Sequence, residues 1–246
     1  MLVWRDLGII GSLTLLILGC SDGTNSAGQM SKQVVQKTNV SQLIAADETQ
    51  KVEDYFQQGN IFLESHLYSY AVGEYDKAIA LKPQKYEAWI NQGNALTGLQ
   101  RNTEALASYD KAIAIKKDLH EAWYNRGNTL TKLQRYTDAL ASYNTAIEIK
   151  PDKYEAWTNR GIILTKLGRY SEGIASYNQA IALQPKHHEA YYNKACSYAL
   201  QNNIELTIEN LQNAIKLSPS TYQQLAKTDP DFQKVRNNKQ FQKLLE

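Results

Sequence analysis

The chain has 246 residues, of which 43% are hydrophobic and 21% are charged. This composition is ordinary for a globular protein, so the chain has enough apolar residues to bury a core. Its 27 basic and 25 acidic residues give a net charge of +2. So weak a charge argues against a dedicated nucleic-acid-binding protein, which needs a concentrated basic face. The two cysteines, Cys20 and Cys196, lie in very different contexts and are not expected to form a disulfide.

The N-terminus contains an uncharged hydrophobic run over residues 7–18. A run of this length is too short to span a bilayer and is typical of a signal peptide. It ends in Ile17-Leu18-Gly19-Cys20, which resembles the bacterial lipobox. The resemblance implies a signal peptide over residues 1–19, cleavage before Cys20, a lipid anchor on that cysteine, and a location at a bacterial membrane facing the extracytoplasmic side (the periplasm). An uncleaved hydrophobic N-terminus and an ordinary cleaved signal are the alternatives.

Residues 20–51 are expected to form a lipidated, disordered tether. They are rich in Ser, Thr, Asn, Gln, Gly and Lys, and they show no helical periodicity before about Ser41. A flexible chain of about 30 residues reaches roughly 30 Å. The tether would therefore hold the rest of the protein close to the membrane surface.

The next part of the chain, residues 52–221, repeats with a period of 34 residues. A period of this size is typical of stacked supersecondary units. With the recurring aromatic residue at the fourth position, the units are 52–85, 86–119, 120–153, 154–187 and 188–221. The recurring residues are an aromatic (Trp89, Trp123, Trp157 and Tyr191), a glycine (Gly59, Gly93, Gly127 and Gly161), an alanine (Ala78, Ala112, Ala146, Ala180 and Ala214) and a proline (Pro83, Pro151, Pro185 and Pro219).

Each unit contains two amphipathic stretches of about a dozen residues, which predict two helices, A and B, joined by a short polar turn. The small residues Gly93 and Ala105 would let the two helices of the second unit come close. We expect Trp89 and Tyr109 to fill the volume around that contact. One helix pair cannot bury its own apolar face, so the units must stack on each other.

The pattern of aromatic, Gly, Ala, aromatic, Ala and Pro over residues 52–221 resembles the tetratricopeptide repeat (TPR) family. The resemblance implies an all-α fold, namely a right-handed superhelix of five helix-turn-helix repeats whose concave face is lined by the A helices. Residues 222–246 resemble the segments that close such arrays, and they are expected to form capping helices. Asp229-Pro230-Asp231 marks a helix start within them.

Asparagine and tyrosine side chains recur at positions that face the concave groove in this family. A side-chain amide offers both donors and an acceptor, so it can hold a peptide backbone without reading its sequence. Tyrosine adds apolar contact with little loss of entropy. The alternative is that the asparagines tie neighbouring repeats together, and both roles can hold. The expected peptide-binding residues are Asn60, Asn91, Asn94, Tyr124, Asn125, Asn128, Asn159, Tyr192 and Asn193.

Charged residues recur at other positions of the repeat. The glutamates at position 2 make the groove acidic or simply lie where the helix dipole stabilises a carboxylate. The arginines suggest either a basic stripe or solvated and packing roles. The cations of the family's carboxylate clamp are absent, since its places hold residues such as Tyr124 and Glu155. The recurring charged residues are Glu53, Glu87, Glu121, Glu155 and Glu189, and Arg101, Arg135, Arg169, Arg126, Arg160 and Lys194.

The sequence contains no recognisable catalytic or metal-binding motif. His187 and His188 are adjacent, so their side chains would diverge on a helix, and Cys196 has no candidate base near it in sequence. We therefore predict no enzymatic activity, no metal and no cofactor. A hydrolase would need a catalytic triad or metal site that the sequence does not show.

The predicted function is a membrane-tethered scaffold that binds peptide segments or partner proteins on the concave face. Nucleic acid and small-molecule substrates are not expected among its partners. The alternative is a cytoplasmic adaptor of the same family, with an uncleaved N-terminus, for complex assembly or signalling.

Overall fold

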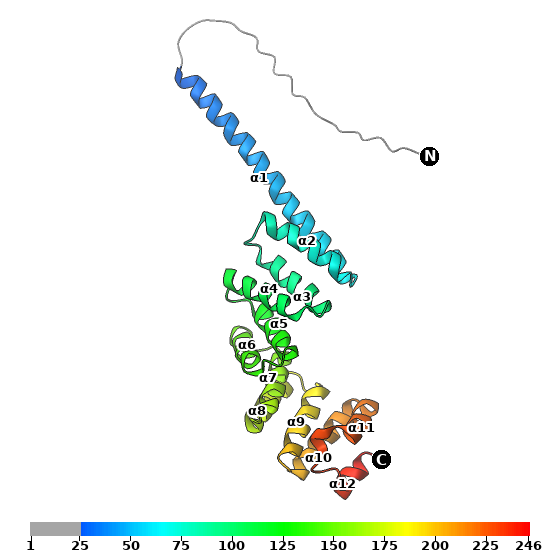
Figure 1. The fold of residues 1–246 in the computed structure, drawn as a ribbon. Coiled ribbons are helices and arrows are strands. Elements are labelled where there is room, and N and C mark those ends of the chain that lie inside the picture. Colours follow the sequence, from blue (N-terminus) through cyan, green and yellow to red (C-terminus); the bar gives the residue numbers. More distant parts are fainter. Residues whose placement is uncertain (1–25) are drawn as a thin grey trace, which may run out of the picture. The chain divides into compact units, whose positions relative to one another are not determined.

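A computed structural model describes residues 26–246 of the chain, with side chains from residue 40 on. The expected signal peptide and the candidate lipidation site, Cys20, lie outside the described residues. The described part is all helical and contains no strand, so the predicted all-α fold is confirmed (Figure 1). None of the described helices has the length and hydrophobicity needed to cross a bilayer.

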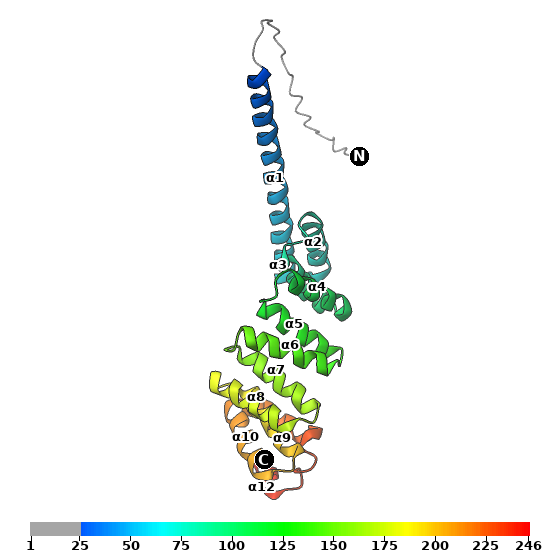
Figure 2. The same cartoon turned by 90° about the vertical axis from the view of Figure 1, so that its left-hand side faces the viewer.

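The first helix, α1, spans Ser26–Glu64, and its last turns form helix A of the first unit. From α2 to α10 the helices stack in chain order as antiparallel neighbours (Figure 2). Each later unit therefore consists of one A helix and one B helix. The other elements are α2 (Tyr68–Leu81), α3 (Tyr86–Gly98), α4 (Asn102–Ile115), α5 (His120–Lys132), α6 (Tyr136–Ile149), α7 (Tyr154–Lys166), α8 (Tyr170–Leu183), α9 (His188–Leu200), α10 (Ile204–Leu217), α11 (Pro219–Thr228), the 3₁₀ helix η1 (Pro230–Phe232) and α12 (Lys239–Leu244).

The start of α1 differs from the disordered tether that was expected over residues 20–51, because the chain is helical from Ser26 on. Residues 26–51 contain no proline and many good helix formers such as Ala, Gln and Lys. Gln50 Nε2 also donates a hydrogen bond to Asp54 Oδ1 at 2.8 Å, one turn further along. All side chains from residue 40 to residue 51 are exposed. A helix without a buried face has no reason to show hydrophobic periodicity, so the sequence pattern did not reveal it.

Within a unit, helices A and B meet where a glycine faces a tyrosine ring. A Cβ atom added to Gly93 in α3 would lie 2.6 Å from the ring of Tyr109 in α4, so no other residue fits without displacing the ring. The tyrosines of this contact are at most 1% exposed. The contact recurs in the pairs Gly59–Tyr75, Gly127–Tyr143 and Gly161–Tyr177.

Trp89 packs against the cluster around Tyr109, as expected, but it lies at the edge of that cluster. Trp89, Trp123 and Trp157 are only partly buried. Each indole N–H donates to a backbone carbonyl six residues earlier, as Trp123 Nε1 does to the carbonyl of Lys117 at 2.9 Å. The large side chain at the A–B contact is therefore the tyrosine of helix B, while the tryptophan secures the loop that enters helix A.

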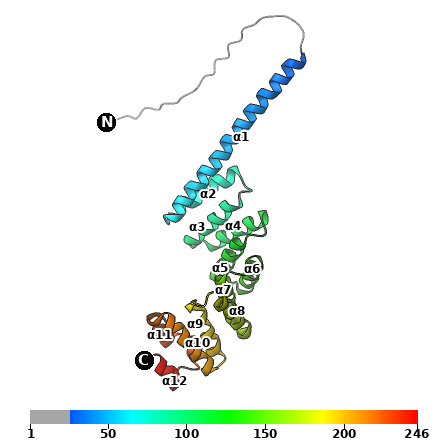
Figure 3. The ribbon, with the colours of Figure 1, turned by 180° about the vertical axis from the view of Figure 1, so that it is seen from behind.

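The C-terminal residues cover unit five. The segment α11 packs against α10, η1 against α9, and α12 against α10 (Figure 3). Phe232 and Phe241 are fully buried in this cluster. Asp229 caps η1, with its side chain accepting a hydrogen bond from the backbone N–H of Asp231, as the sequence predicted. The helix α11 begins at Pro219, slightly before the expected start of the cap at residue 222.

Adding a methyl group at the glycine–tyrosine contact should destabilise the array. Gly127→Ala places a Cβ 2.7 Å from the Tyr143 ring and should lower the free energy of unfolding by about 1–3 kcal/mol. Gly73→Ala in α2 is the matched control, because nothing lies within 4 Å of its added Cβ. The control should raise stability by about 0.5–1 kcal/mol through better helix propensity. Urea unfolding followed by circular dichroism measures both, and equal effects would contradict the packing account.

Candidate functional site

The side-chain amides of six asparagines link the A helices of neighbouring units. Asn91 Nδ2 donates to Asn60 Oδ1, Asn125 Nδ2 to Asn94 Oδ1, and Asn159 Nδ2 to Asn128 Oδ1, each at 2.9 Å. We call this set the asparagine ladder. The ladder joins units one to four, so these asparagines do tie neighbouring repeats together.

The buried tyrosines of the B helices bond to the same oxygens. The hydroxyls of Tyr75, Tyr109 and Tyr143 donate to Asn60, Asn94 and Asn128, at 2.9, 2.8 and 2.8 Å. Each of these amide oxygens therefore accepts two hydrogen bonds. Among the described residues, the Nδ2 atoms of Asn60 and Asn94 have no hydrogen-bond partner, and neither do the Oδ1 atoms of the three neighbours. Asn128 Nδ2 bonds to the Tyr124 hydroxyl and keeps its second N–H. The ladder thus keeps unused donors and acceptors after it has joined the repeats.

A pocket of about 520 Å³ lies along the ladder between units two and four, and we call it the central pocket. Four ladder asparagines line it together with the threonines at position 12, Thr97 and Thr131. Ile162 and Ile163 add apolar surface, and Lys132 is its only charged lining residue. The threonines were not among the expected site residues, although Thr97, Thr131 and Thr165 recur with the 34-residue period. The pocket offers neutral polar groups beside a larger apolar surface.

Tyr124 lies next to the ladder. It is partly buried, and its hydroxyl accepts a hydrogen bond from Asn159 Nδ2 at 3.2 Å. The ammonium group of Lys153 lies 4.5 Å from the centre of its ring. Burial raises the pKa of Tyr124. The hydroxyl therefore stays neutral near pH 7 and can donate to a ligand.

Tyr192 is not available as a peptide-binding residue, so this part of the expected site is wrong. It is only 5% exposed, and its hydroxyl donates to Asp229 Oδ2 at 2.6 Å. Its ring stacks on Tyr222 of α11 at 4.7 Å between centroids. Burial, and then the hydrogen bond to Asp229, raises the pKa of Tyr192. The C-terminal cap covers the side of α9 that the repeat pattern assigns to the groove.

Asn193 has no ladder partner because Ile162 stands where units one to three have asparagine. It lines a pocket of about 400 Å³ together with Asp229 and Asp231 of the cap. The ladder therefore ends at Asn159. The open part of the groove runs over α3, α5 and α7.

Cys196 also lies under the cap, where it is 3% exposed. Burial, and then the charges of Asp229 and Asp231, raises the pKa of its thiol well above the ordinary value. A protonated, buried thiol is inert, as expected for a small hydrophobic residue. The side chains of Cys196, Asp229 and Asp231 could together hold a metal ion, since their ligand atoms lie within 4.8 Å of one another. They suit one poorly, because both carboxylate oxygens of Asp229 already accept hydrogen bonds.

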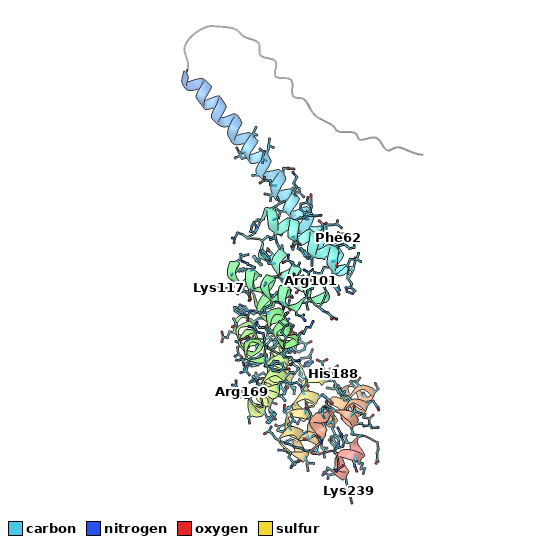
Figure 4. The ribbon with its side chains drawn as sticks, in the orientation of Figure 1. Phe62, Arg101, Lys117, Arg169, His188 and Lys239 are labelled. Carbon is cyan, nitrogen blue, oxygen red and sulfur yellow. The ribbon has the colours of Figure 1, made fainter. Side chains whose placement is uncertain are left out.

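The recurring arginines have partners within the array. Arg126 donates to Asp110 and Ser142, and Arg160 donates to Asn144 and Ser176, so both connect the B helices of adjacent units. The arginines that precede the B helices are exposed, as Arg101 and Arg169 show in Figure 4. Each forms an ion pair in the first turn of its helix. These pairs are Arg101–Glu104, Arg135–Asp138 and Arg169–Glu172.

The tetratricopeptide repeat family models match four parts of the chain. Tetratricopeptide repeats match residues 120–153, 154–187 and 188–221, and a TPR repeat model matches residues 93–134. Together they cover residues 93–221, which is 129 of the 246 residues and more than half of the chain. Among curated protein sequences, none matches the chain.

Several solved structures resemble this one. YrrB, a TPR protein with an unusual peptide-binding site, is 26% identical with a TM-score of 0.64, over 73% of this chain and 93% of that chain. A MamA structure is 17% identical with a TM-score of 0.66, over 74% of this chain and 97% of that chain. MamA from Desulfovibrio magneticus RS-1 is 18% identical with a TM-score of 0.66, over 70% and 97%. The likeness to MamA shows the shared fold alone.

The buried tyrosines should make the array sensitive to alkali. Burial raises the pKa of Tyr143 above its ordinary value near 10. Stability is then fully present below about pH 10 and falls at higher pH, because only the unfolded chain ionises there. Each such tyrosine contributes about 1.4 kcal/mol per pH unit.

Above about pH 10, the unfolding free energy of Tyr143→Phe should fall less steeply than that of the parent, by about 1.4 kcal/mol per pH unit. Tyr70→Phe is the control, since the Tyr70 side chain is 66% exposed. Urea unfolding at a series of pH values measures the slope. The same slope in Tyr143→Phe and in the parent would show that the buried hydroxyl is not the cause.

Proposed function

Because the chain belongs to the tetratricopeptide repeat family, we propose that it binds an extended segment of a partner protein in the concave groove over α3, α5 and α7. Proteins of this family are generally interaction scaffolds. The observation that carries the proposal is the set of unused amide groups along the central pocket. No catalytic step is part of the proposed function.

The ladder presents these groups in a regular order. Asn94 at position 9 has an unused Nδ2 donor group, and Asn128 keeps one N–H beside its bond to the Tyr124 hydroxyl. The asparagines at position 6, such as Asn125, have unused Oδ1 acceptors. An extended backbone presents carbonyl and N–H groups in alternation, so it can pair with both kinds. Because the central pocket has one charged lining residue, this contact reads the backbone more than the side chains of the partner. The similarity to YrrB, which has a peptide-binding site, favours the same class of ligand.

We also propose that Cys20 is lipidated and tethers the array to the outer side of a bacterial membrane. The support is the lipobox-like sequence Ile17-Leu18-Gly19-Cys20 after a hydrophobic run of signal-peptide length. Several acyl chains on one residue give stable anchoring, since each buried CH₂ contributes about 0.8 kcal/mol. The partner would then be a protein at the same membrane surface. A cytoplasmic adaptor with an uncleaved N-terminus is the competing location.

Two isosteric substitutions separate groove binding from array stability. The double variant Asn94→Asp and Asn128→Asp keeps the oxygens that accept the ladder bonds and removes the unused Nδ2 donors. Its stability should change by less than about 1 kcal/mol, while partner capture should fall at least about tenfold, through loss of two hydrogen bonds worth roughly 0.5–1.5 kcal/mol each. Crosslinking in cells followed by mass spectrometry measures the capture.

Gln92→Ala is the matched control for this test. Gln92 also connects neighbouring units, through hydrogen bonds with Asp76 and Ser108, but it does not line the central pocket. This variant should lose stability and keep the dominant crosslink. Full capture by the aspartate variant would place the binding surface outside the groove.

The lipid anchor has its own test. Blocking signal peptidase II should cause a heavier precursor to accumulate, and Cys20→Ala should move the protein from the membrane to the soluble fraction. Cys196→Ala removes the other cysteine of the chain and should leave the membrane fraction unchanged. A soluble parent protein with no precursor would favour the cytoplasmic alternative.

A further inference from the structure

A second pocket, of about 410 Å³, lies beside the ladder at the N-terminal ends of α3 and α5. Phe56, Ile90 and Leu119 give it an apolar wall, and Ile90 is only 6% exposed. Asn91 of the ladder borders it as well. A segment held along the ladder would therefore pass this pocket, and any role of the pocket in binding that segment rests on the proposed function.

Three carboxylates, those of Glu87, Asp118 and Glu121, line this pocket, and we call it the acidic pocket. Its lining contains no lysine or arginine. Within the described residues, none of the three carboxylates takes part in a recorded ion pair. Two lysines lie at the edge of the pocket without an ion pair to these carboxylates. Lys85 Nζ lies 4.3 Å from the ring centre of Phe56 and Lys116 Nζ lies 5.0 Å from that of Tyr86, and both rings line the pocket.

Comparison with unit one shows that Glu87 lacks a lysine partner. In unit one, Lys85 at position 34 pairs with Glu53 at position 2, with 2.8 Å between Nζ and Oε2, and this hydrogen bond lowers the pKa of Glu53. One period later the same places hold Leu119 and Glu87. Glu87 therefore has no lysine where Glu53 has one.

The unit after that restores the lysine. Lys153 occupies position 34 of unit three, and its ammonium group lies over Tyr124 as that of Lys85 lies over Phe56. Position 34 is thus a lysine in units one and three, on either side of the acidic pocket, and a leucine in unit two, at the pocket itself. The helix dipole stabilises Glu87 and Glu121 in the first turns of α3 and α5. It does not account for Asp118, which precedes α5.

One more polar group at the pocket lacks a partner. The Nδ1 atom of His120, which lines the pocket, is buried and has no hydrogen-bond partner. Burial, and then the positive charges of Lys150 and Lys153, lowers the pKa of His120. The ring is therefore neutral near pH 7, and one of its nitrogens can accept a hydrogen bond from a cation.

We propose that the acidic pocket binds a lysine or arginine side chain of the partner segment. The aliphatic stem packs against Phe56, Ile90 and Leu119, and the charged head lies among Glu87, Asp118 and Glu121. The pocket is large enough for such a side chain, and the three carboxylates supply acceptors for its N–H donors. The partner is therefore a protein segment with a basic residue beside a stretch that is held through its backbone.

The test uses the whole chain and a pool of blocked octapeptides. Each position of the pool is drawn equally from Ala, Ser, Asn, Leu, Tyr, Lys and Glu. Peptides retained by the immobilised protein are sequenced by mass spectrometry. The parent should enrich lysine over glutamate by about tenfold, the ratio that corresponds to about 1.4 kcal/mol.

The variant Glu87→Gln, Asp118→Asn and Glu121→Gln should lose this enrichment. Its control, Asp152→Asn, Glu155→Gln and Glu189→Gln, removes the same charge at the same repeat positions in later units, and it should keep the enrichment. A second variant, Leu119→Lys, recreates the arrangement of Lys85 and Glu53 inside the pocket. It should also lose the preference for lysine, through competition rather than through loss of the carboxylates.

The amount of bound peptide and its composition distinguish the possible failures. If no peptide binds, or if binding is unchanged in the Asn94→Asp and Asn128→Asp variant, the proposed function fails and this inference fails with it. If peptides bind through the ladder without lysine enrichment, only the acidic pocket is refuted. Equal loss of enrichment in the acidic-pocket variant and its control would refute it too, since the effect would then come from net charge. Circular dichroism checks that each variant is folded.

Discussion

Each of the first four repeat units depends on the contact between the glycine of helix A and the buried tyrosine of helix B. Because the glycine has no side chain, the Tyr109 ring lies directly against α3, and its hydroxyl reaches Asn94 on the concave side. The same amide oxygen accepts a bond from Asn125 of the next unit. One ring therefore sets the spacing within a unit, the orientation of a groove amide and the link to the next unit. The core tyrosine and the asparagine ladder therefore bond to the same amide oxygen.

The functional differences between units come from exceptions to the repeat. Ile162 ends the asparagine ladder, Leu119 leaves a glutamate without its lysine, and Tyr192 is covered by the cap. The regular residues build a uniform surface of neutral amides, which suits a backbone of any sequence. The exceptions, Ile162, Leu119 and Tyr192, divide that surface into regions that differ in charge and in extent. Under the proposed function, the selectivity of the array would depend on where the pattern is broken.

The period of 34 residues was enough to predict the helix pairs, the all-α fold and the asparagines that face the groove. It placed both Tyr109 and Trp89 at the A–B contact but could not show that Tyr109 is buried there while Trp89 lies at the edge. The burial of Tyr192 depends on Asp229, which lies in the cap beyond the repeats. The helix over residues 26–51 has no buried face from residue 40 on, so hydrophobic periodicity could not reveal it. The sequence alone did not show that Leu119 leaves Glu87 without an ion-pair partner, because the ion pair between Lys85 and Glu53 is seen only in the structure.

The cap restricts how this array can grow in evolution. The segment around Asp229 covers the concave side of unit five. The helices α11 and α12 pack against α10 of the same unit. A duplicated unit appended after α10 would have to rebuild the whole cluster around Phe232 and Phe241. A copy of unit two or unit three would meet matching glycine, tyrosine and asparagine partners on both sides. Longer relatives of this chain should therefore arise by internal duplication, which lengthens the groove in steps of one helix pair and keeps the C-terminal end unchanged.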